Sequence, residues 1–226
     1  MKLQSIYKIS GTIRLISGLH IGAGKDNIEI GGLDQPVIKH PIDGSPYIPG
    51  SSIKGKMRSL LELYYFAQEN EATRNFVIDQ GRPCACGQKG CMACTIFGSS
   101  AKDKDSELGP TRLMVRDAVL SPEWMGKHKN GDLRMEVKYE NTIHRIKGTA
   151  EHPRPLERVP AGVCFDLNIS MKHFEGDPDL LDYVNKGFKL IELDALGGCS
   201  SRGCGQIRFE NLKCDDQEID LNTVKI

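Results

Sequence analysis

Four cysteines crowd into the middle of the chain and could hold a metal ion. Glycines between them permit the tight turns that a tetrahedral site requires, and four thiolates are a ligand set of structural zinc. Because four sulfur ligands leave no open position for water, we expect a structural rather than a catalytic ion. An iron–sulfur cluster and free thiols are the alternatives. The four residues are Cys84, Cys86, Cys91 and Cys94.

A glycine-rich loop at residues 197–205 surrounds a single arginine, Arg202. Glycines let backbone N–H groups approach a phosphate closely, and the guanidinium adds charge and fork-like donors. Such a loop can hold a nucleic-acid backbone without reading its bases. A plain connection between a helix and a strand is the alternative. The predicted RNA contacts in this loop are Gly198, Ser201, Arg202 and Gly203.

Polar residues gather where a helix is expected to begin after Pro49. Ser51 or Ser52 is the expected N-cap, and Lys54 and Arg58 share one helix face at i,i+4. Since a helix N-terminus favours anions, these four residues predict a second phosphate contact. The alternative is an ordinary solvated face of an amphipathic helix.

Asp34 stands in a long glycine- and proline-rich loop, between Gly31-Gly-Leu and Gln-Pro36. An exposed acid there can orient or activate a reacting 2′-hydroxyl, directly or through a divalent ion. An Asx-turn explains the same spacing. No Ser-His-Asp or paired-histidine pattern accompanies it, so these residues alone do not establish catalysis.

The expected insertion at residues 120–160 has, from Arg134 to Arg158, six basic residues against four acidic ones. Together with Ile143 and Ile146, this surplus of positive charge suits an extended arm that lies on or between bases. Arg145 and Lys147 are the candidate RNA contacts, and simple surface solvation is the alternative. The other charged residues are Arg134, Glu136, Lys138, Glu140, Glu151, Arg154, Glu157 and Arg158.

Composition limits the class of protein. The chain has 226 residues, 39% of them hydrophobic, which indicates a folded protein. Thirty basic and thirty acidic residues cancel, so the overall positive charge common in nucleic-acid binders is missing. No apolar run is long enough for a bilayer, the N-terminus does not suit a secretory signal, and we expect a cytoplasmic location with no membrane partner.

Hydrophobic periodicity predicts the elements that position these residues. Alternating residues predict strands near 9–15, 112–119, 163–171 and 206–212, and helical spacing predicts helices at about 51–66 and 178–196. Asp177 and Pro178 are expected to start the second helix and Gly197-Gly198 to end it. The order βαββαβ predicts an α+β, ferredoxin-like (RRM-like) core, with an αβ enzyme of another topology as the alternative. Insertions are expected at residues 18–50, 67–110 and 120–160.

Four motifs, read together, resemble the RAMP-superfamily backbone subunits of type III-A CRISPR effector complexes. The resemblance covers essentially the whole chain as a single domain, residues 1–226. The motifs are Gly18-Leu-His20-Ile-Gly-Ala-Gly24, Gly31-Gly-Leu-Asp34-Gln-Pro-Val, Ile48-Pro-Gly-Ser-Ser-Ile-Lys-Gly-Lys-Met-Arg58 and Leu196-Gly-Gly-Cys-Ser-Ser-Arg-Gly.

The resemblance implies a filament of several copies along a CRISPR guide RNA, capped by other effector subunits. Residues 120–160 would form a thumb-like hairpin pushed between paired bases. The target would be a single-stranded RNA that pairs with the guide. Asp34 would cleave it once per subunit with Mg²⁺ or another divalent ion, leaving a cyclic phosphate. His20, Lys54, Arg58 and Arg202 are implied guide contacts.

The cysteine insertion departs from the simplest members of that family, so the resemblance gives residues 80–94 no role. A guide-binding subunit without catalysis and a guide-processing endoribonuclease of the same superfamily remain the alternatives. A metal-dependent enzyme centred on the cysteines is the remaining hypothesis.

Overall fold

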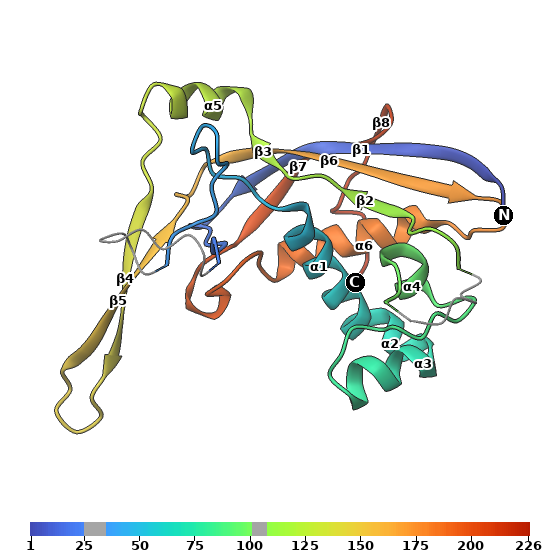
Figure 1. Ribbon diagram of the computed structural model, residues 1–226, viewed down its shortest axis with the longest axis horizontal. Helices are drawn as coiled ribbons and strands as arrows, with labels where there is room; N and C mark the ends of the chain where they lie inside the picture. Colours follow the sequence, from blue (N-terminus) through green and yellow to red (C-terminus); the bar gives the residue numbers. More distant parts are fainter. Residues whose placement is uncertain (25–34, 101–107) are drawn as a thin grey trace.

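The computed structural model describes residues 1–24, 35–100 and 108–226, built around one antiparallel sheet (Figure 1). Its strands run in the order β2-β6-β1-β7-β8, and β3 also pairs with β6. Ile9, Ile13 and Leu15 of β1 are buried while their neighbours alternate outward, as a strand with one covered face requires. The strands are β1 (Leu3–Leu15), β2 (Leu113–Val115), β3 (Val119–Leu120), β6 (Cys164–Phe174), β7 (Ile207–Cys214) and β8 (Gln217–Glu218).

Two helices, α1 (Gly50–Leu61) and α6 (Leu180–Leu193), lie side by side on one face of the sheet (Figure 1). The helices can approach closely because a Cβ added at Gly187 would lie 2.5 Å from Cγ of Met57. Phe188 continues the core to the sheet, where its ring centroid lies 4.8 Å from that of Phe209. The main core is thus the layer between these helices and the sheet.

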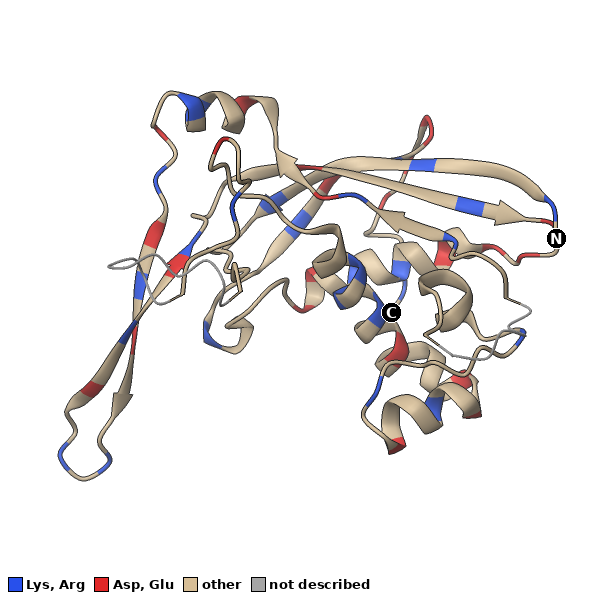
Figure 2. Ribbon diagram, in the orientation of Figure 1, with Lys and Arg blue, Asp and Glu red and all other residues tan. Residues whose placement is uncertain are grey.

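A two-stranded hairpin, β4 (Glu136–Ile143) with β5 (Ala150–Arg158), extends away from the sheet (Figure 1). A short helix, α5 (Pro122–Lys129), precedes it. The hairpin lies within the range expected to form the thumb, and basic and acidic residues are interspersed along it (Figure 2).

Short helices at the other end of the molecule carry the cysteine segment. Here α1 continues directly into π-helix, and a loop with three of the cysteines leads into the last helix, which carries Cys94. These helices are η2 (Glu62–Phe66), α2 (Ala67–Glu69), α3 (Glu71–Arg74), η3 (Asn75–Asp79) and α4 (Met92–Phe97).

The predicted α+β class with an antiparallel sheet is confirmed, and the six core elements occur in the predicted order. Among the described residues, none of the helices combines the length and apolar character that a bilayer-spanning segment requires.

Three predicted helix ends are wrong. Pro49, not Ser51 or Ser52, is the N-cap of α1, because the helix already begins at Gly50. Asp179 caps α6 in place of Asp177, whose carboxylate instead pairs with Arg112.

The third error concerns the end of α6. The helix ends at Leu193, since Asp194 leaves helical backbone angles before the glycines are reached. The carboxylate of Asp194 forms an ion pair with Lys56 of α1 at 2.7 Å.

Candidate nucleic-acid interface and metal centre

The glycine-rich loop forms one turn of 3₁₀-helix, η4 (Ser200–Arg202), between α6 and β7. Cys199 enters the turn with φ 59° and Gly203 leaves it with φ 83°, so left-handed residues bracket it. Within the described chain, the N–H groups of Ser200 and Ser201 have no hydrogen-bond partner. Both residues are exposed, so the turn presents free N–H groups that could donate hydrogen bonds to a phosphate.

Glycine is required where this loop packs against the segment after β1. At Gly197, with φ 79°, an added Cβ would lie 2.4 Å from the backbone oxygen of His20. At Gly205, with φ 80°, it would lie 1.9 Å from the backbone oxygen of Leu196. Hydrogen bonds from Gly198 N–H to His20 and from Gly205 N–H to Gly18 close this contact.

Arg202 reaches from the turn to strand β4 of the hairpin. Its Nε donates to Oε1 of Glu140 at 2.8 Å, and its Nη2 lies 2.9 Å from Sγ of Cys199. Lys138 donates from Nζ to the backbone oxygen of Arg202 at 2.5 Å. The predicted phosphate cradle and the predicted thumb therefore meet at the base of the hairpin.

His20 is buried behind the glycine loop rather than exposed to solvent. Its Nδ1 lies 2.8 Å from the backbone oxygen of Glu157 in β5. Because a carbonyl can only accept, Nδ1 is the donor in this contact. The implied role of His20 as a guide contact stays a prediction, and its observed role is to join the loop to the hairpin.

Glu157 fixes the described segment that follows Asp34. Its buried carboxylate accepts from the N–H of Val37 at 2.8 Å and from Nζ of Lys39 at 2.7 Å. Its own N–H donates to the backbone oxygen of Gln35 at 3.1 Å. Asp34 itself lies outside the described residues, so its catalytic role stays a prediction.

At the start of α1, the predicted phosphate contacts divide into exposed and engaged side chains. Ser51 is exposed and Ser52 half-buried. Lys54 donates from Nζ to the backbone oxygen of Leu113 at 2.9 Å, and burial, followed by the charge of Arg58, lowers the pKa of this lysine. Arg58 binds Glu62 at 2.7 Å and the backbone oxygen of Cys84.

The other two predicted contacts, Arg145 and Lys147, lie in the turn at the tip of the hairpin and are exposed. The structure therefore does not gather all predicted contacts into one place. It joins the glycine loop, His20 and the base of the hairpin, and leaves the hairpin tip distant from them (Figure 1).

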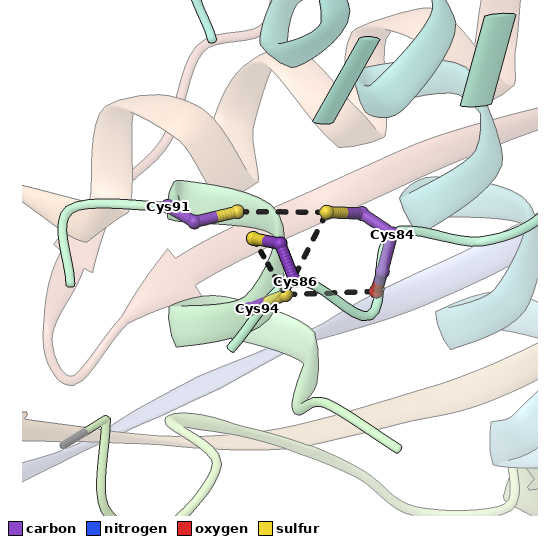
Figure 3. A group of neighbouring side chains, drawn as sticks. All are labelled: Cys84, Cys86, Cys91 and Cys94. Atoms are coloured by element: carbon purple, nitrogen blue, oxygen red, sulfur yellow. Dashed lines mark hydrogen bonds between the residues drawn. The ribbon is translucent and has the colours of Figure 1, made fainter. Parts of the chain in front are cut away.

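The four cysteines do come together (Figure 3). Their sulfur atoms lie within 4.8 Å of one another, with Cys84 at 3.7 Å from both Cys91 and Cys94, and Cys86 at 3.9 Å from Cys94. A tetrahedral ion with Zn–S bonds of ~2.3 Å places its sulfurs ~3.8 Å apart. The donor set and its spacing therefore fit a four-sulfur metal ion.

Buried polar groups surround the cysteine cluster. The hydroxyl of Thr73, which is fully buried, lies 3.3 Å from Sγ of Cys91. Thiol hydrogen bonds from Cys84 and then Cys94 lower the pKa of Cys91, whereas the hydrogen bond with Cys84 raises the pKa of Cys94 and burial raises that of Cys86. The N–H of Cys84 donates to Glu62, so the end of α1 holds this segment.

Sequence reasoning gave no individual role to Lys39, Lys138, Glu140 and Glu157. The available signal was the period of two in β4, where Glu136, Lys138 and Glu140 turn inward and apolar neighbours turn outward. The partners on the glycine loop lie about sixty residues further along the chain, and no local pattern specifies them.

Comparison with known proteins gives a family model, the RAMP superfamily, that matches residues 12–208. The chain is 43% identical to "CRISPR system Cms endoribonuclease Csm3" of Methanothermobacter thermautotrophicus, over 97% of this chain and 90% of that protein. It is 40% identical to the protein of the same name from Streptococcus thermophilus, over 91% and 88%.

A solved structure described as "Crystal structure of Csm3-Csm4 subcomplex in the type III-A CRISPR-Cas interference complex" is also similar. The identity is 29% and the TM-score 0.58, over 95% of this chain and 82% of that one. The likeness therefore covers nearly all of this chain and most of the other.

Proposed function

The chain belongs to the RAMP superfamily, and on this basis we propose that it is the target-cleaving backbone subunit of a type III-A CRISPR interference complex. One observation carries the assignment: 43% identity, over 97% of the chain, to a curated CRISPR endoribonuclease. The protein is therefore an endoribonuclease that acts in antiviral defence within an assembled complex.

The guide RNA would lie over the glycine loop and the base of the hairpin. The free N–H groups of Ser200 and Ser201 and the exposed guanidinium of Arg202 suit backbone phosphates. Gly198 and Gly203 would allow close approach, while Ser51, Ser52, Lys54 and Arg58 would give a second contact.

The hairpin would act as the thumb that separates paired bases. Ile146 at its tip is 92% exposed and Tyr139 is 64% exposed, so neither side chain is used by the fold. Arg145 and Lys147 flank Ile146 and would contact phosphates of guide or target. Copies of the chain would then stack as a filament along one guide, with other effector subunits at its ends.

Asp34 would carry the cleavage of the target strand, in a loop that Glu157 anchors through Val37 and Lys39. A carboxylate there can hold a divalent ion such as Mg²⁺ or orient the 2′-hydroxyl of the target. The 2′-hydroxyl would give its proton to a base such as this carboxylate, its oxygen would bond to the adjacent phosphorus, and the bond from phosphorus to the 5′-oxygen would break as that oxygen takes a proton from water. Cleavage would leave a cyclic phosphate at regular intervals.

Asp34→Ala in a reconstituted complex tests this assignment. We expect loss of the regularly spaced cuts with guide occupancy unchanged, measured by gel analysis of labelled target RNA. Asp132→Ala is the matched control, because Asp132 is exposed and its carboxylate has no partner in the described chain. Regular cuts that persist in the Asp34→Ala complex would show that another group is catalytic.

Recovery of CRISPR-derived guides from the purified native complex tests guide binding separately. If the guide-loaded complex still cleaves its target when a chelator has removed the free divalent ions, the proposed role of Mg²⁺ is refuted.

For the cysteine cluster we propose structural zinc bound by Cys84, Cys86, Cys91 and Cys94. The closed four-sulfur set would crosslink the helical insertion and supply no reactive water. Elemental analysis distinguishes zinc from an iron–sulfur cluster.

The finer description of the fold is also a proposal. The strand order β2-β6-β1-β7, with α1 and α6 on one face, supports a ferredoxin-like core. Residues 1–226 would form a single domain with insertions at 18–50, 67–110 and 120–160, working in the cytoplasm.

A further inference from the structure

We propose that Glu140 is a positioning residue that aims Arg202 at a guide phosphate. This inference rests on the proposed guide-binding role of Arg202. The residues concerned come from strand β4 of the hairpin and from the glycine loop, which meet at the base of the hairpin.

The contacts of Arg202 use only one edge of its guanidinium. Nε donates to Oε1 of Glu140 at 2.8 Å and Nη2 contacts Cys199, while Nη1 has no partner within the described chain. An arginine carries five donors in a planar fork, and the outer edge, Nη1 with Nη2, suits two phosphate oxygens. Glu140 and Cys199 therefore hold the inner edge, which leaves Nη1 and the second hydrogen of Nη2 available to a phosphate.

The two partners differ in mobility. The side chain of Glu140 is 21% exposed and belongs to the inward row of β4, whereas that of Arg202 is 56% exposed. A free arginine of that exposure would sample many rotamers and lose them on binding. The half-buried carboxylate selects one orientation before RNA arrives, which lowers the entropic cost of binding.

The backbone beneath Arg202 is held by the same strand. Lys138, two residues before Glu140 on the same face of β4, donates to the backbone oxygen of Arg202 at 2.5 Å. Both ends of Arg202 are thus fixed to the hairpin. The contact also joins the guide-binding loop to the thumb, so the hairpin base and the guide contact would keep a fixed position relative to each other.

Affinity for single-stranded RNA tests the proposal. Full-length variants would be titrated, at one fixed salt concentration, against a fluorescent RNA carrying the guide sequence recovered from the native complex. Removing any acid strengthens RNA binding through net charge, so Glu140→Ala must be compared with a variant of equal charge. Glu151→Ala is that control, because Glu151 lies on the same hairpin and its carboxylate has no partner in the described chain.

We expect Glu140→Ala to bind about threefold to tenfold more weakly than Glu151→Ala, the cost of ordering one long side chain. Glu140→Gln, whose amide oxygen can still accept from Nε, should recover part of that loss. In an Arg202→Ala background, Glu140→Ala should have no further effect beyond that of Glu151→Ala, whereas a purely structural role of Glu140 would weaken binding in both backgrounds.

Two results would overturn the proposal. Equal or tighter binding by Glu140→Ala than by Glu151→Ala would show that the carboxylate competes with RNA or is irrelevant. An equal loss with Arg202 absent would assign Glu140 a structural role. Unchanged binding by Arg202→Ala alone would instead refute the guide contact itself, which separates failure of the premise from failure of the inference.

Discussion

Removing one sulfur from the cysteine cluster should destabilise the whole fold, and Cys91→Ser is the sharpest change. Cys91 is fully buried, and Cys84 and Cys94 are 1% and 2% exposed and belong to the same hydrophobic core as the sheet. The cysteine cluster cannot open without exposing that core. Loss of metal should therefore appear in global unfolding rather than only in local unfolding.

The size of the effect follows from ligand linkage. An ion that binds only the folded state, at a free concentration a thousandfold above its Kd, stabilises it by ~4.1 kcal/mol. For a domain of this size, 1 kcal/mol corresponds to a Tm shift of ~2–4 °C. We therefore expect Cys91→Ser, or a zinc chelator acting on the native protein, to lower Tm by ~8–16 °C.

Thermal unfolding with parallel elemental analysis provides the assay. Cys214→Ser is the control, because that buried cysteine lies outside the cluster and should leave metal content and chelator sensitivity unchanged. A native preparation with no stoichiometric metal, or a Tm that is insensitive both to chelator and to Cys91→Ser, would refute the reasoning.

Two further predictions concern other parts of the fold. Asp177→Asn should cost about 3–5 kcal/mol, because Arg112, whose side chain is 5% exposed, loses its ion-pair partner. Burial alone would raise the pKa of Asp177, but hydrogen bonds from Arg112 and the N–H of Phe174 lower it overall. This stabilisation is thus complete above the unfolded pKa of ~3.9 and lost as pH falls through the lower folded value, so urea unfolding of the wild type should weaken more steeply below pH ~4 than that of Asp177→Asn. Gly205→Ala should cost about 1–3 kcal/mol in the same assay and weaken RNA binding, since its Cβ would meet the backbone of Leu196. Gly203→Ala shares the left-handed φ but meets nothing within 4 Å, so an equal destabilisation there would contradict the steric argument.

Periodicity predicted the core elements because each buries a regular face. The alternation from Val163 to Met171 and the stripe of Val184, Phe188 and Ile191 depend only on local spacing, and both elements formed. The cysteine cluster was predictable for a similar reason, since all four ligands lie within one short segment.

Helix ends and long-range partners were less accessible to sequence reasoning. Asp177 and Asp179 both precede α6, and only tertiary contact with Arg112 decides which of them is free to cap it. The partners of Arg202, Lys54 and Arg58 likewise lie on other elements. Spacing predicted that Lys54 and Arg58 share a helix face, but not that these cations are engaged by other parts of the chain.

Neutral overall charge is compatible with RNA binding because acids at the proposed interface are partners of its cations. Arg202 pairs with Glu140, Arg158 with Glu136, and Lys39 with Glu157. These pairs lower the net charge near the RNA and therefore its long-range attraction. They also fix the direction of each cation, so RNA affinity at the proposed interface would depend more on the geometry of a few oriented donors than on an excess of positive charge. A site of this kind should bind an RNA whose phosphates follow one defined path through it, in preference to other polyanions.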